Sequence, residues 1–313
     1  MNTLPPHNDV SPINPVVDVS SLSKSYGTLV ALDNVSFSVS PGQVFCLVGP
    51  NGAGKTTLID CILGLKSPNN GSIKIFGYSI EDDSHRKKCL SSIGVQFQQD
   101  SMYEDIQVEE ALHLYATMYQ APIDIQELMS LFRIEHLRKK SYKTLSGGEQ
   151  RKLLIAITLV GDPKLVFLDE PTSNLDPHAR KELWHILGDL RKRGLTIFLS
   201  THNMEEAQEQ SDIICLIDSG KIIAQGNIES LLEKFQLEFK FAVDTEDDLI
   251  YLNELPNVTQ VVKDSTHTLV YGRGDSFVES ISGTLQSKGI SKYSVGPANL
   301  EDLFLLSTKK PES

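Results

Sequence analysis

The sequence has few cysteines, no long hydrophobic run and no excess of positive charge. Its four cysteines, Cys46, Cys61, Cys89 and Cys215, are widely separated. We interpret them as reduced core residues rather than a disulfide framework or a metal site. The longest apolar stretches, such as residues 153–157 and 213–217, are far shorter than the ~20 residues that a membrane-spanning helix needs.

No signal peptide follows Met1, so we expect a cytosolic protein that reaches a membrane only through another chain. Lys and Arg number 29 against 41 Asp and Glu, which gives a net charge of −12. General nucleic-acid binding requires a basic face, so this balance argues against a nucleic-acid partner. We find neither internal repeats nor heptads. The 313 residues suffice for one large domain with a small one, or for two medium ones.

One glycine-rich segment is the most informative feature that is present. Its residues are Gly49, Pro50, Asn51, Gly52, Ala53, Gly54, Lys55, Thr56 and Thr57. The apolar run 44–48 before it predicts a buried strand, and the apolar spacing over residues 56–65 after it predicts a helix. A glycine-rich turn that binds nothing is the alternative. The order strand, loop, helix favours a phosphate-binding loop instead.

Each part of this loop has a chemical role in the predicted site. Glycines let backbone N–H groups curl around a phosphate, and the new helix directs its positive end at the same phosphate. Lys55 can reach the β- and γ-phosphates of ATP, and the Thr56 hydroxyl can ligate Mg²⁺.

A second signal is the apolar stretch 165–168, which ends in Asp169 and Glu170. Many strands end in an acidic residue, so the pair alone is a weak signal. Parallel strands of one sheet end at the same edge, however, which would bring both carboxylates near the phosphate loop. We therefore expect Asp169 to serve Mg²⁺ and Glu170 to deprotonate an attacking water.

The segment Ser146, Gly147, Gly148, Glu149 predicts a capping box at a helix start. A capping box does not require two adjacent glycines, each of which costs a helix ~1 kcal/mol. Bare glycines there make sense if the helix N-terminus must approach something closely, such as the γ-phosphate of a second nucleotide.

Taken together, these motifs resemble those of ATP-binding cassette (ABC) ATPases over about residues 16–235. In this resemblance, residues 146–149 correspond to the signature motif that contacts ATP across a dimer. Gln98 corresponds to the glutamine that contacts Mg²⁺ and links the site to a helical subdomain, although Gln96 and Gln99 are close by. His202 corresponds to the switch histidine on the γ-phosphate.

Two further positions take their expected roles from the same resemblance. Tyr26 corresponds to the aromatic residue that stacks on adenine. Asp176 lies in the loop that crosses between two subunits, where Asn174 replaces a more usual small residue. Asp176 followed by Pro177 is also a helix N-cap pattern, so a purely structural role for Asp176 stays open.

The predicted fold is an α/β P-loop ABC ATPase core with a helical subdomain, plus a small C-terminal α+β (ferredoxin-like) domain. We expect a disordered tail over residues 1–15, the nucleotide-binding domain over 16–235 with its helical subdomain at about 100–160, and an accessory domain over 236–313. In the last part we predict strands at 239–243, 258–262, 268–271 and 290–295, with helices at 247–255 and 276–287.

The end of the chain carries one more pattern. Residues 299–305 predict a helix capped by Asn299, with Leu300, Leu303 and Phe304 on one apolar face. The segment resembles the tail of ABC ATPases that serve drug and antibiotic exporters. A short docking helix without functional meaning is the alternative.

The resemblance implies an ATPase with ATP and Mg²⁺ that drives a separate transmembrane permease, most simply for export of a drug, peptide or lipid-like compound. It implies a head-to-tail homodimer at the inner face of the cell membrane, with each ATP between residues 49–57 of one chain and 146–149 of the other. An importer subunit remains open. A soluble ABC-type ATPase acting on nucleic acid or ribosomes is the rival class. A non-hydrolysing regulatory subunit is disfavoured because Glu170 and His202 are both present.

Overall fold

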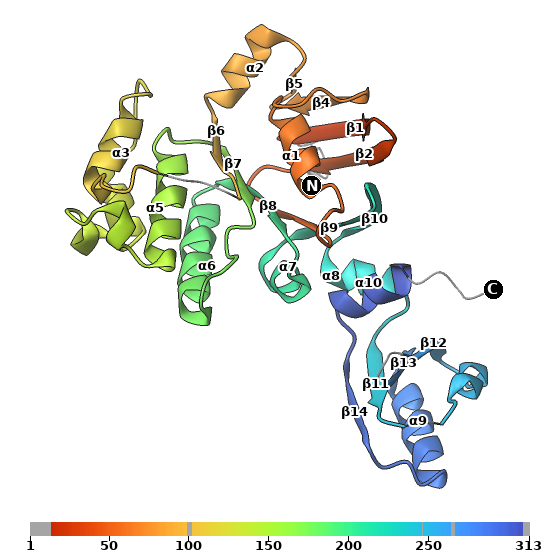
Figure 1. Cartoon of the computed structure of the whole chain (residues 1–313). Helices are drawn as coiled ribbons and strands as arrows, with labels where there is room; N and C mark the ends of the chain where they lie inside the picture. Colours follow the sequence, from red (N-terminus) through yellow and green to blue (C-terminus); the bar gives the residue numbers. More distant parts are fainter. Residues whose placement is uncertain (1–13, 99–101, 246, 264–266, 309–313) are drawn as a thin grey trace, which may run out of the picture.

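The structure is a computed structural model that describes residues 14–98, 102–245, 247–263 and 267–308. Nearly all of the predicted tail, residues 1–15, lies outside this part of the chain. The described residues form three sheets, with the C-terminal sheet set apart from the other two (Figure 1).

The central sheet has the strand order β10-β9-β3-β8-β7-β6. Its strands are β3 (Val44–Val48), β6 (Ile93–Gln96), β7 (Leu165–Asp169), β8 (Thr196–Thr201), β9 (Ile213–Asp218) and β10 (Lys221–Gly226). All neighbours are parallel except β10, which pairs antiparallel with β9. Every residue of β3, β7 and β8 is buried, as the short apolar runs predicted for an interior parallel sheet.

Side chains of β3 alternate between two separate cores. One set of side chains, from Val44, Cys46 and Val48, packs against the helices on one face of the sheet. Phe45 and Leu47 pack on the other face, against the N-terminal sheet. The ring of Phe45 stacks between Phe37 and Phe198, with centroid distances of 5.0 and 5.1 Å. The sheet is therefore covered on both faces, and only its strand ends remain free for chemistry.

The N-terminal sheet is antiparallel with the order β2-β1-β4-β5. Its strands are β1 (Val17–Tyr26), β2 (Leu29–Val39), β4 (Asn70–Ile75) and β5 (Tyr78–Ser79), followed by α2 (Asp83–Leu90). The helix after the phosphate loop, α1 (Lys55–Ile62), is shorter than the predicted 56–65. Gly64 stops it with φ of 70°, while Gly64 N–H donates to Cys61 and Leu65 N–H to Asp60.

The helical region lies at one end of the central sheet (Figure 1). It contains α3 (Val108–Ala116), α4 (Ile125–Leu131), 3₁₀ turns at Glu135–Leu137 and Tyr142–Thr144, and α5 (Gly147–Leu159). The core continues with α6 (Pro177–Lys192), α7 (Met204–Gln210) and α8 (Ile228–Lys234). The side chain of Asp176 caps α6, and Pro177 occupies its first position, as predicted.

The C-terminal sheet is antiparallel with the order β12-β13-β11-β14. Its elements are β11 (Phe239–Val243), β12 (Val258–Lys263), β13 (Thr268–Gly272), α9 (Asp275–Ser287) and β14 (Tyr293–Pro297). This is a ferredoxin-like arrangement, as predicted. The predicted helix 247–255 was wrong in type and length, because only a 3₁₀ helix forms, at Ile250–Glu254. Pro256 follows Leu255 and holds it extended, with ψ of 143°.

The last helix, α10 (Leu300–Thr308), returns to the core and packs beside α7 and α8. Leu300 and Leu303 are fully buried. The Leu300 N–H donates to the Gln208 side chain of α7 at 2.9 Å. Asp302 is 4 % exposed and is held by Lys240 Nζ at 2.9 Å and the Tyr271 hydroxyl at 3.0 Å. The C-terminal part is thereby tied to the helix that follows His202.

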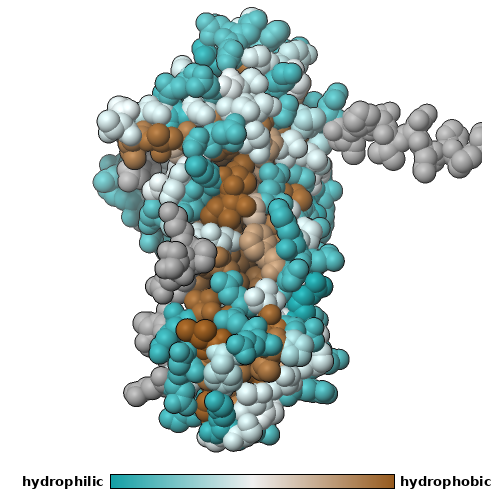
Figure 2. Space-filling model, turned by 90° about the vertical axis from the view of Figure 1, so that its right-hand side faces the viewer, coloured by the Kyte–Doolittle hydropathy of each residue, from teal (hydrophilic) through white to brown (hydrophobic). Residues whose placement is uncertain are grey.

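Figure 2 shows a face of the molecule on which hydrophobic side chains gather. They lie at the same height as α8, α10 and the C-terminal sheet in Figure 1. Partly buried apolar residues of α8, α10 and the segment after α8 belong to the main core; they are Ile228, Leu232, Phe235, Phe304 and Leu306. In the described part of the chain, no helix combines the length and the apolar character needed to cross a membrane.

Candidate active site

The phosphate loop joins the end of β3 to α1, as its sequence predicted. A Cβ at Gly49 would lie 2.1 Å from the carbonyl oxygen of Ile217. Gly54 has φ of 104°, and a Cβ there would lie 2.5 Å from the Ala31 carbonyl oxygen. Gly52 also has a positive φ, of 83°, but its Cβ position meets no atom within 4 Å. Two glycines are thus required by close backbone packing, and the third leaves the loop open.

The start of α1 suits an anion. Its N-cap is Gly54, which offers no side-chain hydrogen bond to the first-turn N–H groups. The helix begins with Lys55, so these N–H groups and the positive end of the helix dipole lie beside a cation. This combination is the one that binds phosphate at helix N-termini.

Lys55 is only 6 % exposed. Its Nζ donates to the carbonyl oxygens of Gly49 at 2.8 Å and Pro50 at 3.1 Å, and lies 4.0 Å from a carboxylate oxygen of Glu170. Burial lowers the pKa of Lys55, and the carboxylates of Glu170 and Asp169 oppose that shift. The ammonium group is therefore held across the loop between polar oxygens.

Asp169 and Thr56 place two oxygen atoms that could ligate a metal ion beside the loop. The Thr56 hydroxyl lies 3.4 Å from Asp169 Oδ2, and the Ser200 hydroxyl donates to Asp169 Oδ1. Burial raises the pKa of Asp169, while the Ser200 hydrogen bond opposes the increase. No group of three or more His, Cys, Asp or Glu residues within the described ranges could hold a metal. The donor set fits Mg²⁺, which takes one or two protein ligands and completes its shell with water and phosphate oxygens.

Glu170 lies at the centre of the polar cluster and is 7 % exposed. Its φ of 50° is in the left-handed region, which non-glycine residues rarely adopt. Ser200 fixes it through a backbone hydrogen bond of 3.1 Å. One carboxylate oxygen accepts from Gln98 Nε2 at 3.1 Å, and the other lies 3.1 Å from His202 Nδ1. The fold therefore brings four predicted residues together: Lys55, Gln98, Glu170 and His202.

The contacts also distinguish between the glutamines near Gln98. Gln96 is fully buried in β6 and donates to the backbone carbonyl of Phe97. Gln99 lies outside the described residues. Of the two described glutamines, only Gln98 has a hydrogen bond to Glu170.

Tyr26 ends β1 and is 42 % exposed. The ammonium groups of Lys24 and Lys66 lie over its ring, 5.2 and 5.6 Å from the centroid. Such cation–π contacts hold the ring in place while it stays accessible to solvent. The ring is thus available for stacking, as the predicted role requires.

The predicted capping box is present at the start of α5. Ser146 Oγ accepts from Glu149 N–H at 3.3 Å, and Glu149 Oε2 accepts from Ser146 N–H at 2.7 Å. A Cβ at Gly147 would meet nothing within 4 Å, so that side of the helix start is open. At Gly148 a Cβ would lie 2.9 Å from the Ala179 Cβ of α6. Close packing between α5 and α6 therefore accounts for Gly148, a reason that the sequence interpretation missed.

Asp176 is exposed and accepts hydrogen bonds from the N–H groups of His178 at 2.9 Å and Ala179 at 3.0 Å. The hydrogen bond from the Ala179 backbone is the main cause that lowers the pKa of Asp176. The neighbouring Asn174 is exposed with φ of 61°. The structure accounts for Asp176 as a helix cap; its contact with a second subunit stays a prediction.

Sequence reasoning missed Ser200. Its hydroxyl donates to the Asp169 carboxylate, and its hydroxyl and carbonyl oxygens accept from the Glu170 N–H. The signal was present, because Ser200 and Thr201 end an otherwise apolar strand directly before His202. It also missed Glu206, a buried carboxylate on α7.

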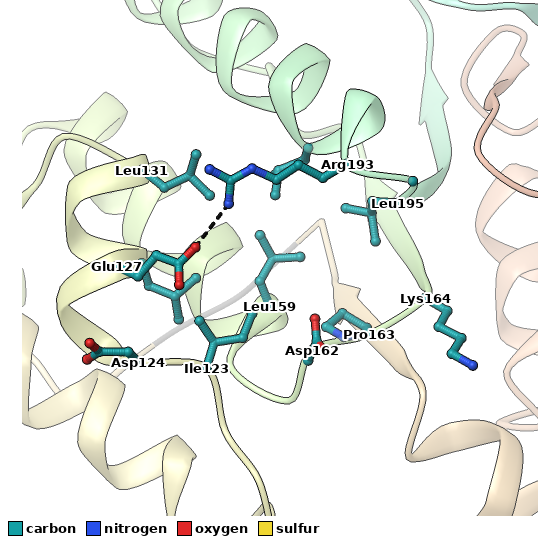
Figure 3. Close-up of a pocket in the computed structure, with 13 residues that line it drawn as sticks. Ile123, Asp124, Glu127, Leu131, Leu159, Asp162, Pro163, Lys164, Arg193 and Leu195 are labelled. Carbon is teal, nitrogen blue, oxygen red and sulfur yellow. Dashed lines mark hydrogen bonds and ion pairs between the residues drawn. The ribbon is translucent and has the colours of Figure 1, made fainter.

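Two of the cavities among the described residues bear on where the site lies. One, of about 450 Å³, lies between α4 and the C-terminal ends of α5 and α6, where Glu127 and Arg193 pair at 3.1 Å across it (Figure 3). None of the predicted site residues lines it. The other, of about 140 Å³, is lined by Glu170, His202 and Glu206, among others. The hydrogen-bonded cluster, rather than the bigger cavity, therefore locates the site.

The chain is similar to known proteins over nearly its whole length. A profile described as "ABC transporter" matches residues 32–173. A Nod factor export ATP-binding protein I from Ralstonia nicotianae is 35 % identical over 307 residues, covering 94 % of each chain. The protein of that name from Rhizobium johnstonii is 32 % identical over 313 residues, covering 97 % of each. The solved structure of cbiO1 from Clostridium perfringens, part of the ABC transporter complex cbiONQ, has a TM-score of 0.64 at 30 % identity and covers 68 % of this chain and 89 % of its own.

Proposed function

The chain belongs to the ABC transporter family as an ATP-binding, ATP-hydrolysing subunit, and from this premise we propose that Glu170 is the general base of the hydrolysis. The observation that carries this proposal is the position of the Glu170 carboxylate. It is buried, it follows Asp169 at the end of β7, and it lies 4.0 Å from the phosphate-loop lysine Lys55.

The substrate ATP binds along the loop and the end of β1. Its phosphates accept hydrogen bonds from backbone N–H groups within residues 52–57, and Lys55 turns from the Gly49 and Pro50 carbonyls to the β- and γ-phosphates. The exposed ring of Tyr26 stacks on the adenine. Thr56, Asp169 and Gln98 would hold Mg²⁺, which supplies positive charge to the phosphate oxygens when bound.

Hydrolysis then follows from the groups around Glu170. Glu170 takes a proton from a water whose oxygen attacks the γ-phosphorus, and the bond to the leaving ADP oxygen breaks. Gln98 and His202 each contact one Glu170 oxygen, so both hold the carboxylate in one orientation. His202 in addition contacts the γ-phosphate. General-base assistance is typically worth ~10²–10⁴-fold in rate.

The assembly we propose is a head-to-tail homodimer. Ser146, Gly147, Gly148 and Glu149 of one chain contact the ATP held by residues 49–57 of the other, with Asp176 at the crossing between subunits. This chain carries both halves of such a site, and a two-fold pair repeats the same contacts twice. The open side of Gly147 leaves room for a phosphate at the start of α5.

The proposed partner is a separate transmembrane permease, which places the subunit at the inner face of the cell membrane. The relatives named Nod factor export ATP-binding protein I favour export. The cargo we propose is a drug, peptide or lipid-like compound. We further propose that residues 236–313 form an accessory domain that serves assembly rather than chemistry. The partly buried apolar side chains of α8 and α10 support a role in contacts.

The test compares Glu170→Gln with Glu205→Gln in the full chain. Glu205 is an exposed carboxylate on α7, which makes it a matched control. The Glu170 variant should bind ATP and form an ATP-dependent dimer on size exclusion, but lose turnover, because an amide cannot take the water's proton. The Glu205 variant should keep both. Hydrolysis by Glu170→Gln at the wild-type rate would remove Glu170 from this role.

A further inference from the structure

Glu206 is a buried carboxylate that the proposed reaction does not use. It lies on α7 and is 6 % exposed. Both of its hydrogen-bond partners are neutral. The indole Nε1–H of Trp184 donates to one oxygen at 2.9 Å, and the Thr201 hydroxyl donates to the other at 3.0 Å. Burying a carboxylate between neutral donors is costly, so its presence calls for a specific reason.

The bonds of Glu206 enclose the backbone on both sides of His202. The Thr201 hydroxyl that donates to Glu206 also accepts from Asn203 N–H at 3.0 Å. The Asn203 side chain in turn accepts from Glu206 N–H at 3.0 Å. Residues 201 and 203 are therefore both fixed to Glu206, and His202 lies between them.

The same turn is linked to the phosphate loop. The Thr201 carbonyl accepts from Gly49 N–H at 3.3 Å. The His202 side chain is 52 % exposed, so few packing contacts restrain its ring. Its 3.1 Å approach to Glu170 consequently depends on the backbone of the turn that carries it.

We propose that Glu206 is a positioning residue of the ATPase: it fixes the turn 201–203 and thereby the position of His202 beside Glu170. This inference rests on the proposed role of His202. The second oxygen of Glu206, bonded to Trp184, ties α7 to α6 and takes no part in the bonds to the turn.

The donors around Glu206 explain why a carboxylate is needed. An indole N–H can only donate, and the Thr201 hydroxyl already accepts from Asn203, so it too must donate. Two donors facing one side chain require two acceptors. A glutamine offers one acceptor and one N–H₂ group, which would reverse the hydrogen bond to Thr201 or oppose the indole. Glu206→Gln therefore disturbs the turn with almost no change in size.

The experiment uses the full chain and four variants: Glu206→Gln, Thr201→Val, Thr201→Ser and Trp184→Phe. Glu206→Gln should lower kcat by roughly 10- to 100-fold, the size expected for a small misplacement of a reacting group, with the ATP dissociation constant unchanged. Thr201→Val should have a similar effect, Thr201→Ser should recover most of the rate, and the double variant Glu206→Gln/Thr201→Val should be no worse than either single one. Trp184→Phe, which keeps the Thr201 bond, should lower Tm but not kcat.

A spectroscopic signal separates positioning from general damage. The imidazole NMR signal of His202, assigned by its loss in His202→Ala, should move in Glu206→Gln and stay in place in Trp184→Phe. If His202→Ala lowers kcat, then wild-type kcat in Glu206→Gln or additive losses in the double variant would overturn the proposal, and an unmoved His202 signal would overturn it in every case. If Glu206→Gln does not fold, the Thr201→Val and Thr201→Ser pair decides by the same two readouts. If His202→Ala hydrolyses ATP at the wild-type rate while the signal still moves, the proposed role of His202 fails, but the positioning by Glu206 stands.

Discussion

Replacing Leu303 by alanine tests how firmly the C-terminal part is attached to the ATPase core. Leu303 is fully buried in the main hydrophobic core, where α10 packs beside α7 and α8. Truncation of a buried leucine to alanine costs ~2–5 kcal/mol, through lost burial and the cavity that remains. If α10 stays docked in the variant, the free energy of unfolding should fall by this amount.

The docking free energy sets a limit on that loss. Burial of Leu300 and Leu303 contributes ~1.5–3 kcal/mol each, before the cost of ordering the helix. The Leu303→Ala change is comparable to the whole docking term, so α10 should detach in a measurable fraction of molecules. Amide hydrogen exchange in α10 and α7 should then accelerate ahead of the rest of the chain.

Urea unfolding can be followed by the fluorescence of Trp184, the only tryptophan, because its indole bonds to α7. Leu305→Ala is the matched control: the same substitution on the same helix, at a side chain that is only partly buried. It should change stability by no more than ~0.5 kcal/mol. Equal losses in the two variants, or unchanged exchange rates in Leu303→Ala, would refute the reasoning that α10 is held by this apolar face.

Three further predictions concern the site and its surroundings. Lys55→Ala should weaken ATP binding in isothermal titration, because the triphosphate loses its fixed cation; an unchanged dissociation constant with unchanged hydrolysis would show that the loop is not the phosphate site. Ser146→Arg should leave ATP binding by the single chain intact but block hydrolysis. Mixing this variant with Lys55→Ala should restore activity, because each heterodimer then holds one intact site built from both chains. No recovery of activity despite proven heterodimers would contradict sites shared between two chains. The Lys152 ammonium, 2.6 Å from Glu182, holds the pKa of that carboxyl below its usual value, so the pair's stabilisation is present above about pH 4.3 and is lost as pH falls through the lower folded-state pKa. The stability difference between wild type and Lys152→Met, measured by urea unfolding, should accordingly shrink on acidification; a difference that grows instead would show that another group dominates.

The phosphate loop and the carboxylate pair could be predicted from the sequence because their geometry is local. A strand followed by a glycine-rich turn and a helix fixes where Lys55 lies, and the end of an apolar strand fixes where Asp169 and Glu170 lie. The interior strands of the central sheet could be predicted equally well, because fully buried strands are continuous apolar runs in the sequence.

Features that depend on a distant neighbour could not be predicted in this way. Ser200 matters because β8 lies beside β7, and Glu206 matters because α7 returns to α6. Gly148 was assigned to the nucleotide because nothing in the sequence places Ala179 against it. The 3₁₀ helix at Ile250–Glu254 is the opposite case, since its cause is local: Pro256 disfavours a helical conformation at Leu255 and so shortens the preceding helix.

The contact between Gly148 and Ala179 gives the α5–α6 pair a fixed pivot. The two helices approach closely near their N-termini, where Gly148 brings no side chain against the Ala179 methyl group, while their C-terminal ends border the cavity of about 450 Å³ in Figure 3. Over its 16 residues α6 is ~24 Å long, so rotation about this pivot moves the cavity end most and the other end least. The starts of α5 and α6, which carry Ser146 and Asp176, would then keep their spacing while the far ends close or open, and any side chain at position 148 would act as a wedge between the two helix starts.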